Sequence, residues 1–150
     1  MLLQRINRSD PEKVFIVVKA GEDLKSGRPV CMHFSGTDDG LVGWLANAAT
    51  DVSAVVGIAD ADITSGDYGL VQCYGFRSAA IAVCASNFTI ANLAILVPVS
   101  VGSGMLSMSA SLGASIIAQP SFIAAVSASS LSSDVSVTGG TDLPVFIRCM

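Results

Sequence analysis

The sequence predicts an all-β fold, either a jelly-roll-like β-sandwich or a β-barrel, with at most one short helix. Short runs of β-branched and aromatic residues recur along the chain, and turn residues separate them roughly every ten residues, which is typical of sandwiches and barrels. The clearest run, residues 70–76, alternates with a period of two, so Val71 and Cys73 face one side of a strand and the even-numbered residues face the other. At 150 residues the chain can bury a core of its own as one domain.

The expected strands follow one another along most of the chain. They cover residues 14–18, 26–34, 54–59, 69–76, 79–85, 95–101, 105–109, 121–126, 134–137 and 145–150. Pro98 interrupts an alternating run, which predicts a sheet edge or a bulge at that position. One short helix is expected over residues 41–48, because Leu41, Trp44, Leu45 and Ala48 recur at helical spacing behind the capping residues at 37–39.

The chain is expected to consist of an N-terminal arm, Met1–Lys13, and a β-domain over residues 14–150. The arm carries Arg5 and Arg8 beside apolar residues, and Pro11 interrupts any continuation into the first strand. Such a segment is a poor core element, so we expect it to contact a partner that offsets the entropy lost when it becomes ordered. No internal repeat is evident.

Charge is sparse and unevenly distributed. Charged residues make up 13% of the chain, the net charge is −4, and no charged residue occurs from Ser78 to Ser133. Six of the eight basic residues lie early in the chain: Arg5, Arg8, Lys13, Lys19, Lys25 and Arg28. Polar residues interrupt the uncharged region, unlike a membrane span, and the basic residues alternate with acids, unlike a nucleic-acid-binding stripe. We therefore expect neither a membrane nor a nucleic acid as partner, but other protein surfaces that cover part of the uncharged region.

The cysteines indicate neither a disulfide framework nor a zinc site. Cys31, Cys73, Cys84 and Cys149 lie far apart, without a CxxC pair or a grouping with histidine. The N-terminal sequence lacks the continuous apolar core of an export signal. We therefore expect reduced thiols and assembly in a cytoplasm.

The first candidate site is the stretch GIADADITSGDYG, residues 57–69. It gathers three aspartates around a glycine: Asp60, Asp62, Asp67 and Gly66. A calcium loop of the EF-hand type needs glycine at its sixth position and glutamate at its twelfth, but counting from Asp60 these positions hold Ser65 and Val71. A phosphate-binding loop would open a helix, whereas this stretch runs into a strand. An irregular cation site remains an alternative, but the sequence favours a turn for which Asp and Gly supply the conformations.

The second candidate site is the sole histidine, His33, which lies two residues after Cys31 on the same face of an expected strand. A nucleophilic Cys–His pair would need a third group to orient the base, and none is evident. The sequence therefore predicts no catalytic residue, no cofactor and no metal, and the protein is not expected to be an enzyme.

Three motifs in the middle of the chain resemble a known family. They are the strand VGIA at Val56–Ala59, the turn GDYG at Gly66–Gly69 and the strand VQCYG at Val71–Gly75, followed by the alternating segment LVPVSV and the ending VFIRCM. In this order they resemble the decoration, or cement, proteins of tailed-bacteriophage capsids. The resemblance covers roughly residues 54–150, and its motifs are structural, so they name no catalytic residue.

The resemblance implies a homotrimeric β-sandwich or barrel on the outside of the virion head, where it strengthens the shell by bridging subunits of the major capsid protein. It also implies that Gly66 and Gly69 permit the turn and that Tyr68 anchors it by packing its ring. Assembly would take place in the host cytoplasm. Two alternatives remain: another phage structural component, such as a head fibre base, a tail protein or a baseplate protein, and a small β-sandwich hydrolase or ligand-binding protein.

Overall fold

The structure is a computed structural model, and it describes residues 12–34, 40, 42–46, 54–83, 92–98, 106–108, 121–127 and 140–149. Its nine strands are β1 (Val14–Ala20), β2 (Pro29–His33), β3 (Val42–Leu45), β4 (Val55–Ala59), β5 (Tyr68–Ala82), β6 (Ile95–Pro98), β7 (Leu106–Met108), β8 (Ser121–Ala124) and β9 (Thr141–Arg148). No α-helix occurs among these residues. The prediction of an all-β fold is confirmed.

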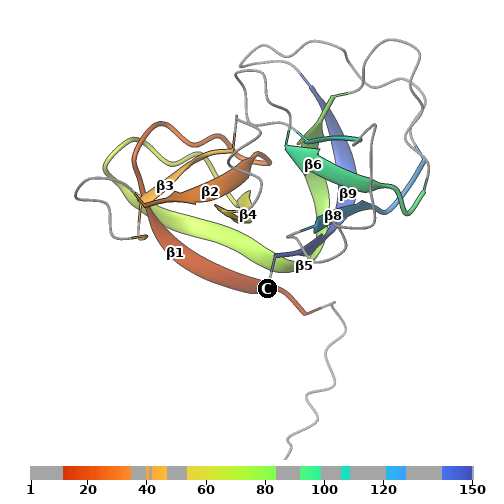
Figure 1. Cartoon of the computed structure of the whole chain (residues 1–150), viewed down its shortest axis with the longest axis horizontal. Helices are drawn as coiled ribbons and strands as arrows, with labels where there is room; N and C mark the ends of the chain where they lie inside the picture. The colour runs from red at the N-terminus through yellow and green to blue at the C-terminus, as the bar shows by residue number, and fades with distance from the viewer. Residues whose placement is uncertain are drawn as a thin grey trace, which may run out of the picture.

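The nine strands form one sheet that closes on itself twice. The strand order is β1-β3-β2-β4-β5-β7-β6-β8-β9, and additional pairings join β1 to β5 and β5 to β9. Strands β1–β5 therefore form one closed ring, here called the first barrel, and β5–β9 form another, the second barrel. Figure 1 shows β1–β4 grouped on one side and β6, β8 and β9 on the other, with the long strand β5 passing between the two groups.

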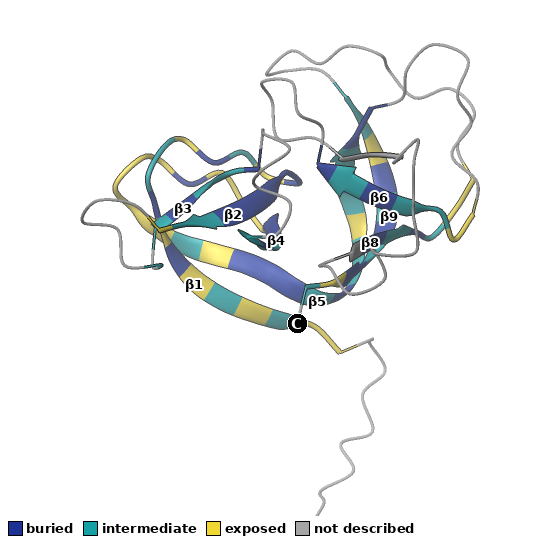
Figure 2. Cartoon of the chain, viewed as in Figure 1, coloured by how far each residue is buried: buried dark blue, intermediate teal, exposed yellow. Residues whose placement is uncertain are grey.

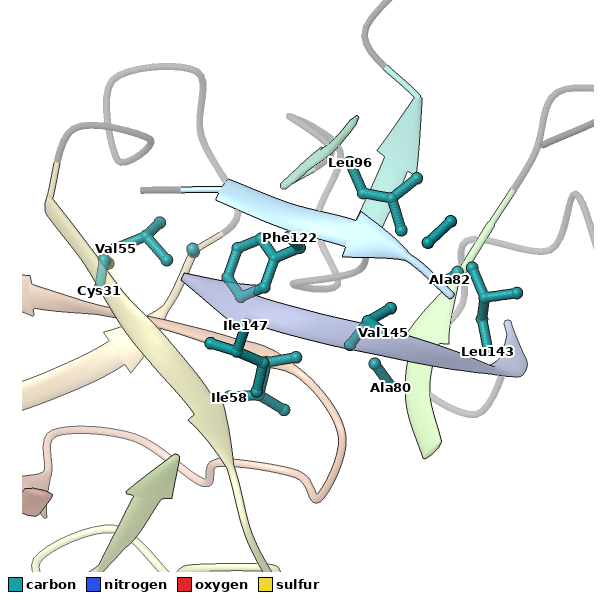
Figure 3. Packing of buried hydrophobic residues seen from close by; sticks show 12 residues of the cluster. Cys31, Val55, Ile58, Ala80, Ala82, Leu96, Phe122, Leu143, Val145 and Ile147 are labelled. Carbon is teal, nitrogen blue, oxygen red and sulfur yellow. The ribbon is translucent and has the colours of Figure 1, made fainter. Parts of the chain in front are cut away.

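Each barrel encloses apolar side chains. The interior of the first barrel contains Val18, Ala20, Leu24, Val30, Ala59, Ile63 and Val71. In the second barrel, Phe122 is fully buried and belongs to one cluster with Leu96, Leu143, Val145 and Ile147, in which it lies beside Ile147 (Figure 3). Residues of the first barrel, among them Val55 and Ile58, belong to this same cluster. The two barrels are therefore joined by a common core as well as by a common strand.

The prediction of a helix over residues 41–48 is wrong for residues 42–46, the part of this range that the structure describes. Residues 42–45 form strand β3, which pairs antiparallel with β2 and parallel with the end of β1. The spacing of Trp44 and Leu45 fitted a helix, but tertiary pairing decided the conformation. The amide of Leu45 donates to the Glu22 carboxylate at 2.8 Å, and the backbone of Gly43 lies so close to Val18 and Val30 that an added Cβ would be 3.2 Å and 3.0 Å from them.

Strand β5 is longer than expected. The sequence predicted two strands, residues 69–76 and 79–85, but residues 68–82 form one strand with a register shift against β9 between Arg77 and Ala80. The strand passes from the first barrel to the second at Tyr74, which pairs with Val14 of β1 and with Arg148 of β9. Just before this point, the Gln72 side chain is 1% exposed and donates to the carbonyls of Tyr74 and Phe76, both at 3.2 Å. A buried amide thus satisfies backbone carbonyls of its own strand.

Other expected strands agree with β1, β2, β4, β6, β7, β8 and β9, although their ends differ by a few residues. Pro98 is the last residue of β6, and the residues of this strand that pair with β8 are Ile95 and Leu96. Because proline has no amide donor, a position at the strand end beyond this pairing is favourable. The expected strand 134–137, Cys84 and the arm as far as Pro11 lie outside the described residues. No helix in the described residues is long and apolar enough to cross a membrane.

Candidate functional site

The acidic stretch forms a loop that lies against a second loop of the same shape. We call residues 20–28 the first loop and residues 59–67 the second loop; the first joins β1 to β2 and the second joins β4 to β5. At their centres, Leu24 and Ile63 form an isolated antiparallel bridge in which each amide donates to the other's carbonyl at 2.9 Å. Both side chains are buried inside the first barrel.

The polar contacts between the two loops are reciprocal. The Asp62 carboxylate accepts the amide of Ser26 at 2.8 Å, and the Asp23 carboxylate accepts the amide of Ser65 at 2.9 Å. The Ser26 hydroxyl also donates to the carbonyl of Asp60 at 3.1 Å, and the Ser65 hydroxyl donates to the carbonyl of Gly21 at 3.2 Å. The loops are therefore related by an approximate two-fold axis, and each satisfies backbone groups of the other.

The two loops turn at equivalent glycines. Gly27 and Gly66 have φ angles of 79° and 90°, a region that glycine adopts without steric cost. The amide of Gly27 donates to the carbonyl of Ala59 at 3.0 Å, and that of Gly66 donates to the carbonyl of Ala20 at 2.7 Å. The adjoining strands follow the same approximate two-fold axis, which relates β1 to β4 and β2 to β5. The antiparallel pair β1–β5 therefore corresponds to the antiparallel pair β4–β2.

The sequence analysis missed this internal repeat. AGEDLKSGR at residues 20–28 and ADADITSGD at residues 59–67 share alanine, aspartate, serine and glycine at the same places, with leucine matched to isoleucine. The common pattern, A-x-x-D-[LI]-x-S-G, was the available signal. It was hidden because the residues between the shared positions differ in charge: the first loop carries Lys25 and Arg28 where the second carries Thr64 and Asp67.

Two of the three candidate aspartates form ion pairs. Asp62 accepts from the Lys25 ammonium at 3.0 Å, and Asp60 accepts from the Arg77 guanidinium at 2.9 Å. The amide hydrogen bond from Ser26 and the contacts with Lys25 lower the pKa of Asp62 below its ordinary value. These carboxylates therefore connect segments of the first barrel, which fits the interpretation of this stretch as a turn.

Arg77 is the main polar residue that sequence reasoning did not identify. Its Nε donates to the carbonyl of Ala79 at 2.8 Å, one Nη donates to the Asp60 carboxylate, and the other donates to the Ser26 hydroxyl and the Asp60 carbonyl. A polar depression of about 170 Å³ beside it is lined by Lys13, Asp60, Gln72, Arg77, Ser78 and Ala79. Because the guanidinium is engaged by the protein itself, its contacts point to a structural role.

A larger depression, of about 300 Å³, lies over the second loop and the start of β5. Asp60, Asp62 and Asp67 all line it, so the structure brings the three candidate residues together. Among the described residues, however, no three histidine, cysteine, aspartate or glutamate side chains are grouped so that they could hold a metal ion. The expected absence of a metal remains a prediction for the chain as a whole.

Tyr68 does not anchor the turn with its ring, contrary to the expectation drawn from the resemblance. Its side chain is 72% exposed, because it lies on the outer face of β5 opposite Lys19. Ile63 fills the space below the turn instead, and a Cβ atom added at Gly69 would lie 2.3 Å from its Cδ1. The second glycine of the GDYG motif therefore admits the Ile63 side chain.

Cys31 and His33 both lie on β2, and Cys31 belongs to the core cluster that contains Phe122. The Cys31 side chain is 5% exposed, and its thiol lies 3.6 Å from the carbonyl of Trp44 as a donor. His33 lies two residues along β2, and its ring contacts the Trp44 ring with centroids 5.4 Å apart. Both side chains therefore contact β3, an arrangement that serves packing.

Cys73 and Cys149 lie beside each other where β5 meets the end of β9. The amide of Cys149 donates to the carbonyl of Cys73 at 3.0 Å, and both thiols are free. Burial, together with the nearby Cys73 thiol, raises the pKa of Cys149 to about 12. Thiols that hold their protons so strongly are poor nucleophiles at neutral pH.

No protein-family model matches the sequence, and no curated protein matches it at a significant level. The resemblance to phage decoration proteins therefore remains a prediction that rests on the motifs themselves.

Proposed function

We propose that the protein is a capsid decoration protein, a cement protein on the outside of a tailed-bacteriophage head. In this role it bridges subunits of the major capsid protein, acts as a homotrimer and performs no chemistry. It is assembled in the host cytoplasm and remains part of the virion. Binding stabilises the shell by linkage, because a protein that binds only the assembled shell shifts the equilibrium toward that shell.

One observation carries the proposal: the polar groups of the candidate site are used to join the two loops. Asp23 and Asp62 accept amides of the opposite loop, and Asp60 engages Arg77. An enzyme would instead direct such groups toward a substrate, with a nucleophile and a base within hydrogen-bond reach of each other. The same contacts favour a rigid binding module.

Two glycines of the motifs quoted above support the proposal, because Gly57 and Gly75 lie where a neighbouring backbone leaves no room for a side chain. A Cβ atom at Gly57 would lie 2.2 Å from the carbonyl oxygen of Gln72, and one at Gly75 would lie 2.1 Å from the carbonyl oxygen of Glu12. These motifs therefore describe a particular folded shape. A motif that encodes a shape supports a structural protein better than it supports a family defined by its chemistry.

The test is to locate the chain on intact particles of the phage that carries this gene, by electron cryomicroscopy. We expect many copies spread over the outside of the head at positions where three capsid subunits meet, and light scattering should report a trimer of the purified protein. A few copies confined to the tail, the baseplate or a head fibre would support the alternative phage roles. A monomer in solution that also sits singly on the particle would contradict the trimer.

A further inference from the structure

The outer face of the ribbon formed by β1 and the start of β5 is apolar and exposed. Phe15, Val17, Tyr68 and Leu70 are 37%, 62%, 72% and 46% exposed, respectively. The register places Val17 opposite Leu70 and Lys19 opposite Tyr68, so these side chains are neighbours on one face. In Figure 2, exposed positions alternate along β1 with less exposed ones. We call this face, with the exposed Lys13 and Lys19, the ribbon face.

The pattern on β1 is unusual for a strand with one solvated face. Such strands alternate apolar residues toward the core with polar residues toward water. Here Ile16 and Val18 point toward the barrel interior, but the outward residues read Lys13, Phe15, Val17 and Lys19. An exposed apolar band between two lysines indicates a surface that a partner covers.

The edge of this ribbon is also open. Strand β1 pairs with β5 from Val14 to Lys19, but it pairs with β3 only at Lys19 and Ala20. Among the described residues no strand occupies the remaining length of its outer edge. Lys13 and Lys19 form no ion pair with any described residue, whereas Lys25 on the nearby loop does. Of the three aspartates in the depression beside Tyr68 and Leu70, Asp60 and Asp62 are engaged by Arg77 and Lys25, so Lys13 and Lys19 stay outside these ion pairs.

We propose that the ribbon face is the surface by which the protein docks onto the capsid shell, an inference that rests on the proposed function. The partner surface presents apolar side chains between two groups of carboxylates. The rise of an extended strand places Lys13 and Lys19 roughly 20 Å apart, which sets the separation of those carboxylates. Burial of the apolar band supplies affinity, and the two lysines set orientation and speed association.

The charges argue against other occupants of this face. If two copies paired antiparallel through their β1 edges about Ile16, each Lys13 would face the partner's Lys19, and lysines at such positions oppose edge-to-edge pairing. The N-terminal arm carries Arg5 and Arg8, which the two lysines would repel. An acidic, apolar surface of another protein fits the face better than a second copy or the arm.

The first test removes the apolar band without disturbing the strands. Purified V17T/L70T protein is compared with the wild type for binding to empty heads of the phage that lack this protein. Threonine keeps the β-branched shape at position 17, and both side chains are largely exposed, so the melting temperature should change little. We expect the dissociation constant to rise roughly tenfold or more. Val126→Thr, at a position 42% exposed on the second barrel, is the matched control and should bind like the wild type.

The second test reverses the charges. K13E/K19E should bind heads more weakly and more slowly, whereas K13R/K19R should retain binding and its decrease with salt. Asp142→Lys, at an exposed position at the opposite end of β9 from Arg148, is the control for a charge reversal away from the ribbon face. Circular dichroism and light scattering on every variant show whether fold and oligomeric state are preserved.

The outcomes separate the inference from the function on which it rests. If the wild type binds heads and both ribbon-face variants bind equally well, the docking face is wrong while the proposed function stands. If the variants change the oligomeric state and leave head binding intact, the ribbon face is an interface between copies, which also overturns the inference. If the wild type itself does not bind the heads, the proposed function fails.

Discussion

The two barrels close a small ring of strands by different means. The first barrel combines its apolar interior with paired loops whose aspartates, serines and backbone amides hold each other across an approximate two-fold axis. The second barrel has short strands, β6–β8, that carry no charged residue, and it depends on Phe122 and its apolar neighbours. A small barrel can therefore be closed either by directional hydrogen bonds at its turns or by apolar packing in its centre.

The largest effect is expected from a substitution in the core of the second barrel. Phe122→Ala removes the largest fully buried side chain among the described residues and should lower the free energy of unfolding by about 3 to 5 kcal/mol. Urea unfolding followed by tryptophan fluorescence is the measurement, because Trp44 lies on β3 of the first barrel and packs against the core cluster that both barrels share. Since β5 and the core are common to both barrels, one transition is expected, with Val126→Ala as an exposed control. A Trp44 signal that keeps its wild-type midpoint would show that the barrels unfold independently.

The next effect compares the two loops of the first barrel. Gly27→Ala and Gly66→Ala both place a side chain at a positive φ angle, which costs roughly 1 kcal/mol. An added Cβ at Gly66 meets nothing within 4 Å, whereas at Gly27 it lies 3.0 Å from Ile81 and 3.4 Å from the carbonyl oxygen of Ala79. We expect Gly27→Ala to destabilise the protein more. Equal losses in chemical denaturation would mean that backbone strain alone decides both positions.

A smaller effect appears at alkaline pH. The folded protein holds the Cys149 proton up to a pKa of about 12, while the unfolded chain releases it near its ordinary value of 9.0. Between these values the folded state binds more protons, so stability should fall as the pH rises above about 9. Urea unfolding from pH 8 to 10 should show a steeper decline for the wild type than for Cys149→Ala. Parallel pH profiles would contradict the buried, protonated thiol.

The smallest effect is expected from removing metals or reducing thiols. Asp62 is engaged with the first loop and Asp60 with Arg77, and the described cysteines form no disulfide with one another. Thermal melts with and without chelator or reductant should therefore agree within about one or two degrees, since about 1 kcal/mol would move the midpoint by several. A large decrease with chelator would restore Asp60, Asp62 and Asp67 as candidate ligands.

The sequence predicted the fold class because strand signals are local. The β-branched runs of β1 and β4 needed no tertiary information, and the turn interpretation of the acidic stretch followed from its Asp and Gly content. Strand β3 was missed because the pairing of Trp44 with Cys31 and the bond from Leu45 to Glu22 join distant residues. The partners of Asp60 and Asp62 and the exposure of Tyr68 likewise depend on contacts that no short window of sequence contains.

Strand β5 has a mechanical consequence. It pairs with β1 and β4 near its start and with β9 further along, so both barrels share one continuous stretch of backbone. A load applied where Tyr68 begins the strand is carried to Ala82 through covalent bonds, and the hydrogen bonds to neighbouring strands distribute it sideways. Force along β5 therefore passes from one barrel to the other without crossing a break in the strand.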